Sequence, residues 1–332
     1  MEKVEIIAEI GSVHDGSFGN ALKLIELSKE CGADTVKFQT HIASAETLRD
    51  APMPSYFRGE PRFEYFERTG FTTEQWKYLK SHCDEVGIGF LSSPFSLEAI
   101  DLLEEVGVDT YKVPSGEVTN LPLLEKLAKT GKRILLSSGM SDWRELDQAH
   151  AVLSALGSKV CVMQCSSQYP CDVSQVGLNV MTEMAVRYGD EIGFSDHTHS
   201  NVAAICAVYA GATVIEKHLT FSKKMYGSDA ANAAEPEQFK ALCSSIREAE
   251  KLRHCPVNKD DVSRYREMKT IFEKSIVAAR KIPSGHMLTL QDLAFKKPGN
   301  GIAAARYHEI VGRKTKIDLD TDQMVLEDHL VS

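Results

Sequence analysis

The feature that most constrains this chain is an alternation of short apolar segments, rich in β-branched residues, with longer segments of helical periodicity. The apolar segments predict eight strands, at Val4–Glu9, Asp34–Gln39, Ile88–Ser92, Thr110–Val113, Arg133–Ser137, Val160–Gln164, Glu191–Phe194 and Thr213–Glu216. The segments between them predict helices, at Asn20–Cys31, Thr73–Val86, Leu97–Val106, Leu121–Lys129, Asp142–Leu156, Val176–Tyr188, Asn201–Ala210 and Pro236–Leu252. Eight strand–helix units in about 250 residues predict an α/β fold of the (β/α)₈ TIM-barrel type. The alternative is a doubly wound open sheet, which would collect polar residues at one crevice and not at nearly every strand end.

The 332-residue chain changes character after the last predicted helix. Residues 1–253 predict the barrel domain, the polar residues 254–271 a linker, and residues 272–332 a small, mostly β domain. Short strands with tight glycine turns are expected in that domain at Ser275–Ala279, Leu288–Leu290 and Val311–Leu319.

A long insert, His41–Thr73, interrupts the rhythm of the barrel. It contains several prolines and aromatic residues. Barrel loops of this length are usually lids or dimer contacts, and a plain surface excursion is the alternative.

Charge and composition limit the classes of partner. Lys and Arg number 38 against 47 Asp and Glu, a net charge of −9, which argues against a general nucleic-acid binder or an anionic-membrane binder. No apolar run approaches the roughly 18 residues of a membrane span, and the N-terminus lacks a signal-peptide core. The eight cysteines form no Cys-x-x-Cys pair, so free thiols in a reducing cytoplasm are expected.

Polar side chains gather at the carboxyl ends of the predicted strands, where barrel enzymes hold their active sites. Lys37 and Lys112 lie inside strands, where a scaffold needs no lysine, and serines stand at neighbouring strand ends. Ammonium groups neutralise an anion and hydroxyls orient its oxygen atoms, so this set predicts a site for phosphate or carboxylate. Two alternatives remain, namely lysines that point outward between the helices and a lysine that forms a Schiff base.

Two histidines end adjacent predicted strands. His197 and His218 are one strand–helix unit apart, close enough to share a divalent metal such as Mn²⁺, Co²⁺ or Zn²⁺. A hydrogen-bonded structural histidine is the alternative for each. His14 lies in a glycine-bounded turn and belongs either to that turn or to the site.

Several segments, taken in order, resemble bacterial sialic acid synthases over almost the whole chain, from Val4 to His329. These segments are Ala8–Gly11, Val36–Thr40, Tyr111–Glu117, Ser137–Met140, Gly193–Thr198 and Glu216–Thr220. Near the C-terminus, Lys297–Ile302 is similar to the substrate loop of the antifreeze-like SAF domain found in that family.

The resemblance implies a reaction and a set of site residues. The reaction condenses phosphoenolpyruvate with a 2-acetamido mannose-type aldose, giving a nine-carbon 2-keto-3-deoxy acid, such as N-acetylneuraminate, and phosphate. The implied phosphoenolpyruvate ligands are Lys37, Ser93, Lys112, Ser115, Ser137, Ser167 and Ser195. The residues implied at the sugar and the reaction centre are Gln39, Glu117, Tyr169 and Asp229, with Glu9 handling protons.

The resemblance also implies a metal and a quaternary structure. His197 and His218 would bind Mn²⁺, with Mg²⁺ or Co²⁺ as alternatives. The C-terminal domain, through Lys297, would reach the sugar end of the partner's barrel in a domain-swapped homodimer. Two positions depart from the family pattern, because Ser167 stands where members often carry asparagine and Lys297 where they often carry arginine. Both departures leave the aldose open among N-acetylmannosamine, its 6-phosphate and a 2,4-diacetamido-trideoxy sugar.

Two other functions compete with the synthase. One is a Schiff-base aldolase that uses Lys37 or Lys112. The other is a non-catalytic carbohydrate-binding protein whose SAF-like domain is the working part. The joint presence of metal-ligating, acidic and cationic residues at the strand ends argues against the second.

Overall fold

The computed structural model describes residues 3–331 apart from 53–58, 169 and 190. The chain divides into two compact units, Met1–Pro256 and Val257–Ser332, and each has a hydrophobic core of its own. Among the described helices, none combines the length and the apolar character that crossing a bilayer requires.

The first unit is a closed parallel barrel, as the alternation predicts. Within the described residues the strands follow one another around the barrel in chain order, and the last pairs with the first. They are β1 Glu5–Gly11, β2 Thr35–Thr40, β3 Gly89–Pro94, β4 Thr110–Val113, β5 Arg133–Ser137, β6 Val160–Cys165, β7 Ile192–Asp196 and β8 Val214–His218. The open-sheet alternative is therefore excluded by the pairing of β1 with β8, in which Glu9 lies opposite His218.

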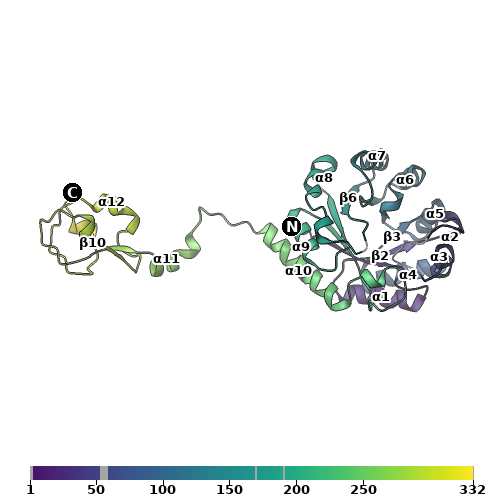
Figure 1. Ribbon diagram of the computed structural model, residues 1–332, viewed down its shortest axis with the longest axis horizontal. Helices are drawn as coiled ribbons and strands as arrows, with labels where there is room; N and C mark the ends of the chain where they lie inside the picture. Colours follow the sequence, from purple (N-terminus) through teal and green to yellow (C-terminus); the bar gives the residue numbers. More distant parts are fainter. Residues whose placement is uncertain (1–2, 53–58, 169, 190, 332) are drawn as a thin grey trace. The chain divides into compact units, whose positions relative to one another are not determined.

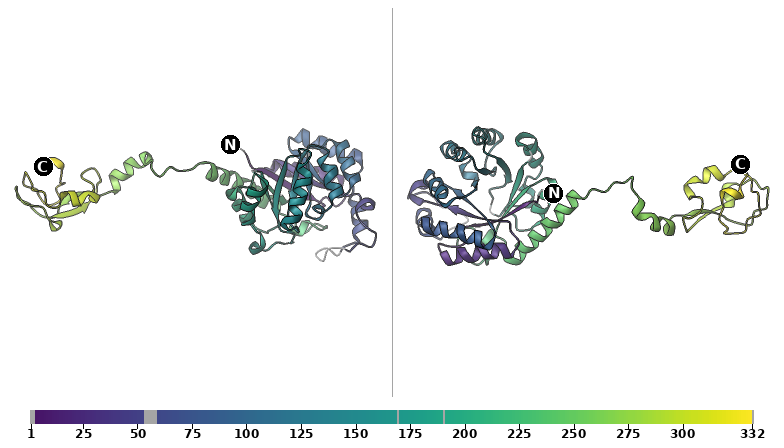
Figure 2. Two further views of the ribbon diagram at one scale, coloured as in Figure 1. Left: turned by 90° about the horizontal axis from the view of Figure 1, so that it is seen from above. Right: turned by 180° about the vertical axis from the view of Figure 1, so that it is seen from behind.

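Helices cover the outside of the strands, as Figures 1 and 2 show for this unit. They are α1 Phe18–Glu30, α4 Thr73–Val86, α5 Leu97–Val106, α6 Leu121–Ala128, α7 Trp143–Ser154, α8 Val180–Tyr188, α9 Val202–Ala210 and α10 Pro236–His254. The predicted helix at Val176–Tyr188 begins four residues later than expected, after the short 3₁₀ turn η2 Val173–Gln175. Helix α4 illustrates the local signals: Thr72 and Gln75 form a capping box at its start, and Gly87, at φ 74°, ends it.

The barrel interior is layered along the strands. A cluster of apolar side chains fills the lower layer, and its members are Ile7, Leu91, Leu135, Cys161, Met163 and Val214. Because side chains on one face of a strand recur every second residue, the next inward residues form a layer above the first. Those residues are Glu9, Ser93, Ser137, Cys165 and Glu216. The apolar layer thus closes the floor beneath a polar layer at the carboxyl ends of the strands.

The second unit contains a small antiparallel sheet of β9 Ser275–Ala278 and β10 Leu293–Lys296. Its other elements are η4 Ser263–Tyr265, α11 Arg266–Phe272, η5 Leu290–Asp292, η6 Ala304–Arg306, α12 Tyr307–Ile310 and η7 Glu327–His329. The stretch expected as a linker therefore carries helix α11.

Two of the strand predictions for this unit are wrong. Leu288–Leu290 and Val311–Leu319 form no strand, and the backbone near them makes only isolated bridges, such as Met287 with Lys314 and Ile282 with Leu319. Leu288 and Leu319 nevertheless enter the apolar core. Leu290, Val311 and Ile317 in the same segments are exposed, so the apolar residues here indicate neither a strand nor uniform burial.

Candidate active site

Two lysines and two glutamates form an ion-paired cluster in the polar layer. Lys37 Nζ lies 2.8 Å from Glu9 Oε1 and 3.9 Å from Glu216 Oε1. Lys112 Nζ donates to both carboxylate oxygens of Glu216, at 2.9 and 3.1 Å. All four side chains are buried. Both lysines therefore point into the barrel, and the outward orientation is excluded.

The opposite charges of this cluster keep one another ionised. Burial alone would raise the pKa of Glu216, but attraction to Lys112 and Lys37 lowers it to about 2. Burial alone would lower the pKa of Lys37, but attraction to Glu216 and Glu9 raises it. At neutral pH the Lys37 ammonium and the Glu216 carboxylate therefore both stay ionised.

Hydroxyl groups surround the lysines. Ser93 accepts a hydrogen bond from Lys37 at 3.3 Å, and Ser195 donates one to Glu216 at 3.1 Å. A small cavity of about 60 Å³ brings together most of the predicted phosphoenolpyruvate ligands. Its lining includes Lys37, Ser93, Lys112, Ser115, Ser137 and Ser195, together with Glu9, Gln39, His197, Glu216 and His218.

Ser167 converges with Ser115 over Gly139. A Cβ atom at Gly139 would lie 2.5 Å from Ser115 Oγ and 2.2 Å from Ser167 Oγ, distances that no side chain tolerates. The glycine of the Ser137–Met140 segment therefore lets two hydroxyl groups approach the same point.

The two predicted metal-binding histidines lie side by side on β7 and β8. Their ring centroids are 5.8 Å apart. His197 Nδ1 donates to the carbonyl oxygen of Ser166 at 2.8 Å. Burial alone would lower the pKa of His197, but the neighbouring Cys165 raises it. Burial lowers the pKa of His218 and favours the neutral imidazole that a cation requires. Among the described residues no group of three or more His, Cys, Asp or Glu side chains has a metal-binding arrangement. Two imidazole rings this close to each other are nitrogen donors of the kind that divalent first-row metals bind, so their chemistry fits such an ion.

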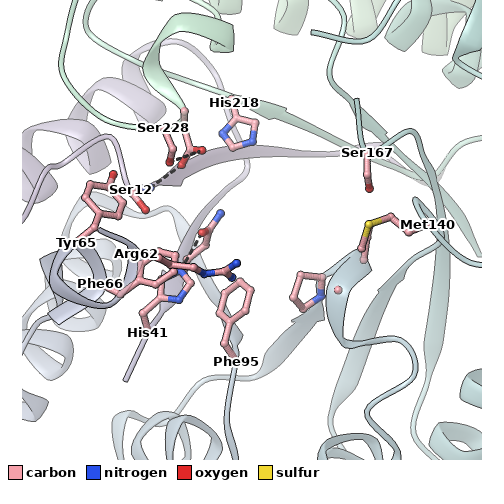
Figure 3. Close-up of a pocket in the computed structure, with 15 residues that line it drawn as sticks. Ser12, His41, Arg62, Tyr65, Phe66, Phe95, Met140, Ser167, His218 and Ser228 are labelled. Carbon is pink, nitrogen blue, oxygen red and sulfur yellow. Dashed lines mark hydrogen bonds between the residues drawn. The ribbon is translucent and has the colours of Figure 1, made fainter. Parts of the chain in front are cut away.

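A larger pocket of about 440 Å³ opens beside the small cavity, and the two share Gln39, Ser115 and His218 in their linings. One wall comes from the insert, which forms α2 Ala43–Glu46 and α3 Arg62–Thr69. Figure 3 shows the labelled residues of both walls. The insert and the loop after β3 contribute His41, Arg62, Tyr65, Phe66 and Phe95, and the opposite side includes Met140 and Ser167. The insert is thus a wall of the pocket.

Asp229 reaches this pocket through the turn after β1. Its Oδ2 accepts a hydrogen bond from the backbone N–H of Ser12 at 2.9 Å. A Cβ atom at Gly11, whose φ is +53°, would lie only 2.4 Å from that oxygen. Glycine at this position is therefore what allows the carboxylate to approach the turn.

The other predicted site residues are placed differently. Glu117 is half-buried and accepts a hydrogen bond from Asn120 at 2.7 Å. It is not among the residues that line the larger pocket. Burial raises the pKa of its carboxyl group. Lys297 belongs to the second unit, where its Nζ lies 4.8 Å from the centre of the Phe272 ring. Tyr169 lies outside the described residues.

His14 belongs to its turn. Its Nδ1 accepts a hydrogen bond from the backbone N–H of Gly16 at 3.1 Å, and its ring centroid lies 4.6 Å from that of Phe71. Neither cavity has it in its lining.

Sequence reasoning left two kinds of site residue out. Glu216 lies two residues before His218 on β8, so the period of a strand could have placed it on the same inward face. Arg62, Tyr65 and Phe66 lie in helix α3 and His41 follows β2, but no local signal in the sequence places this helix against the mouth of the barrel.

Comparisons with known proteins agree with this geometry. The NeuB family matches residues 24–257, and the SAF domain matches residues 273–331. The chain belongs to the NeuB family. The resemblance to sialic acid synthases with an SAF domain is thereby confirmed, and the chain is an enzyme of the sialic acid synthase type.

Relatives of this NeuB-family chain extend over nearly its full length. It is 36% identical to the N,N'-diacetyllegionaminic acid synthase of Campylobacter jejuni, over 98% of this chain and 100% of the relative. It is 33% identical to human N-acetylneuraminate-9-phosphate synthase, over 97% of this chain and 91% of the relative. Among solved structures, the sialic acid synthetase of Leptospira borgpetersenii, crystallised with citrate, matches with a TM-score of 0.72 at 26% identity, over 80% of this chain and 90% of that chain.

Proposed function

We propose that this chain condenses phosphoenolpyruvate with an N-acetylated aldose to give a nonulosonic acid and phosphate. The observation that carries the proposal is the pair of buried lysines among serine hydroxyls, next to a pocket of about 440 Å³. Synthases of legionaminic, pseudaminic and N-acetylneuraminic acids among the relatives support the same class of product.

Phosphoenolpyruvate carries a phosphate and a carboxylate, and each needs cations and hydrogen-bond donors. In the proposal Lys37 and Lys112 supply the charge, and the serines supply the donors. The Schiff-base alternative needs a neutral amine as nucleophile. The raised pKa of Lys37, caused by Glu216 and Glu9 against the effect of burial, disfavours that use of Lys37.

The aldose would occupy the larger pocket, with its aldehyde carbon toward C3 of phosphoenolpyruvate. C3 attacks the aldehyde carbon, and the aldehyde oxygen takes up a proton to become a hydroxyl. Water adds to C2 and loses a proton, and the tetrahedral adduct then expels phosphate, while its remaining hydroxyl loses a proton to give the 2-keto group. Glu9 suits proton handling, because its Oε1 is held by Lys37 while its Oε2 is buried without a hydrogen-bond partner among the described residues. Gln39, Tyr169, Glu117 and Asp229 are proposed at the sugar side. Holding the two substrates close together in the reactive orientation accounts for a large share of the rate enhancement in a reaction of this kind.

A divalent metal, with Mn²⁺ preferred and Mg²⁺ or Co²⁺ as alternatives, would be held by His197 and His218. When bound there it would supply Lewis-acid polarisation of an oxygen atom. The role proposed for these two residues is to present ring nitrogens at the small cavity, whose lining includes both.

The proposal extends to the quaternary structure and to the cellular compartment. Lys297 of the SAF domain would cap the sugar end of the partner's barrel in a domain-swapped homodimer, as the family resemblance implies. The cytoplasm is the proposed compartment, and all eight cysteines being free thiols supports it.

A substrate panel tests the proposal. The purified chain is incubated with Mn²⁺, phosphoenolpyruvate and one of three aldoses: N-acetylmannosamine, its 6-phosphate or 2,4-diacetamido-2,4,6-trideoxymannose. We expect phosphate release and a nonulosonic acid with one of them. Borohydride trapping in the same mixtures distinguishes the aldolase, because it would label a lysine only if a Schiff base forms. Phosphate release with none of the three would contradict the proposal.

A further inference from the structure

His41 is held at the edge of the larger pocket by contacts on both faces of its ring. The ring stacks against Phe66, with centroids 3.7 Å apart and an interplanar angle of 11°, and against Phe95 at 4.1 Å and 20°. Figure 3 shows the three residues on the same side of the pocket. The imidazole plane is therefore fixed, and with it the directions in which its two nitrogens point.

Each ring nitrogen has a partner. Nδ1 lies 2.8 Å from Glu46 Oε1, and Nε2 lies 3.1 Å from Gln39 Oε1. The side chain of His41 is 6% exposed and that of Glu46 is 4% exposed, so water competes little with either contact. The other oxygen of Glu46 accepts a hydrogen bond from the backbone N–H of Ile42 at 3.3 Å, which anchors the carboxylate to helix α2 and its N-terminal turn.

The direction of these hydrogen bonds follows from Glu9. Its Oε1 lies 2.8 Å from Lys37 Nζ and 2.7 Å from Gln39 Nε2. A carboxylate oxygen next to an ammonium group only accepts, so the amide nitrogen of Gln39 must face Glu9. The amide oxygen of Gln39 then faces His41, so Nε2 must carry a hydrogen. The Glu46 carboxylate also only accepts, so Nδ1 carries one too and both ring nitrogens are donors.

We propose that His41 is a positioning residue for the condensation: its Nε2–H fixes the amide of Gln39, and Gln39 in turn holds the carboxylate of Glu9. The inference rests on the proposed function. The proposal also assigns a role to the insert. Glu46 of α2 and Phe66 of α3 hold His41, and through it they set the orientation of the Glu9 carboxylate on β1. Without the donor of His41, the Gln39 amide can rotate and present its oxygen to Glu9, which repels that carboxylate.

Three substitutions separate this role from packing. His41→Phe keeps an aromatic ring between Phe66 and Phe95 but has no donor. His41→Gln places an amide nitrogen near the position of Nε2 but has no ring. His41→Met matches the length of Gln and has neither. His150→Phe is a matched control, since the His150 ring packs on Tyr188, with centroids 4.8 Å apart, and touches neither cavity.

We expect His41→Phe and His41→Met to lower kcat by at least about tenfold, with KM for phosphoenolpyruvate changed by less than about threefold. His41→Gln should retain most of kcat, even if its melting temperature is the lowest of the three. His150→Phe should match the wild type. A packing role gives the opposite order, with Phe more active than Gln and activity following melting temperature. That order, or a wild-type kcat in His41→Met, would overturn the proposal.

A second measurement needs no substrate. In the full-length protein labelled with ¹⁵N-histidine, the Nε2–H signal of His41 is assigned by its loss in His41→Gln. Substituting Gln39→Leu should shift this signal and speed its exchange with water. If the wild type makes no product but the signal responds, the proposed function fails while the contact to Gln39 stands. If Gln39→Leu leaves the signal unchanged, His41 does not hold the amide and the inference fails.

Discussion

Lys112 and Glu216 face each other across the barrel, from β4 to β8, and Nζ contacts both carboxylate oxygens at 2.9 and 3.1 Å. Glu216 also lies 3.9 Å from Lys37, so one carboxylate serves two buried cations. The proposed anion would add its negative charge beside Glu216, so the stability of this cluster and the binding of the anion are coupled.

Glu216→Gln should destabilise the fold and make it responsive to anions. Removing one partner of a buried ion pair costs about 3–5 kcal/mol, because uncompensated charge remains inside. Inorganic phosphate should then raise the melting temperature of the variant more than that of the wild type, since it replaces the lost negative charge. Thermal unfolding with and without phosphate measures this. Glu74→Gln, at an exposed surface pair, is the control. Equal responses of variant and wild type would contradict an anion site at the lysines.

Lys37→Met and Lys112→Met keep the aliphatic stem and remove the charge. Each should raise KM for phosphoenolpyruvate roughly ten- to a hundredfold, the equivalent of the about 1.5–3 kcal/mol of a charge-assisted hydrogen bond. KM for the aldose should change much less. Steady-state kinetics with each substrate varied in turn tests this, with the surface variant Lys126→Met as control. An unchanged KM for phosphoenolpyruvate in either variant would place that lysine outside the site.

Chelation should abolish activity, and Mn²⁺ should restore it. His197→Ala and His218→Ala should each lose Mn²⁺ binding, measured by calorimetry on the folded variant, because two imidazoles are the proposed protein ligands. His199→Ala is the matched control, since His199 is exposed and lies two residues from His197. Full activity in excess chelator would remove the metal from the proposal.

His14 should make stability depend on pH. Burial lowers the pKa of its imidazole from 6.5 to about 4, with Asp229 opposing and His41 reinforcing the shift. The unfolded chain therefore binds the proton more readily, so the stabilisation is complete above pH 6.5 and is lost as the pH falls toward 4. Between pH 7 and pH 5 the contribution of this group falls by about 2 kcal/mol. Urea unfolding of the wild type and of His14→Phe measures the difference, and parallel pH profiles would show that His14 does not carry it.

The domain-swapped arrangement predicts complementation. A barrel variant, His218→Ala, and a chain truncated after Pro256 are each expected to be inactive alone. In a mixed dimer the intact barrel of one chain and the intact SAF domain of the other meet at one site. Random exchange makes about half of the dimers mixed, so roughly a quarter of wild-type activity should return after co-expression. No recovery in confirmed mixed dimers would leave the C-terminal unit serving its own barrel.

The strands and the polar layer could be predicted from the sequence because both follow a period. Lys37 and Lys112 point inward, as their positions in apolar strands indicate, and His197 and His218 meet because adjacent strands end side by side. The pairing of these lysines with carboxylates depends on distances across the barrel, which no local pattern encodes. The strand period can place Glu216 on the inward face with His218, but its contacts with Lys37 and Lys112 follow only from the three-dimensional structure.

Irregular segments were the hardest to predict. Val311–Leu319 is expected as a strand, yet its backbone makes only isolated bridges, and of its apolar side chains Leu319 enters the small core while Val311 and Ile317 are exposed. The length of the insert predicts a lid or a dimer contact, with a surface loop as the alternative, and nothing in the order of its residues places Phe66 against His41. Both cases depend on tertiary packing, which overrides local propensity.

The apolar layer beneath Glu9 and Glu216 closes the barrel on one side of the lysines. Because Ile7 and Val214 close the floor two residues below these carboxylates, a ligand comes to the lysines from the mouth of the barrel, past the pocket walled by the insert. An anion seated beside Lys37 and Lys112 must therefore arrive before a sugar fills the space above it. In the proposed reaction, excess aldose should therefore hinder the entry of phosphoenolpyruvate, and the ligand at the lysines should bind first and leave last.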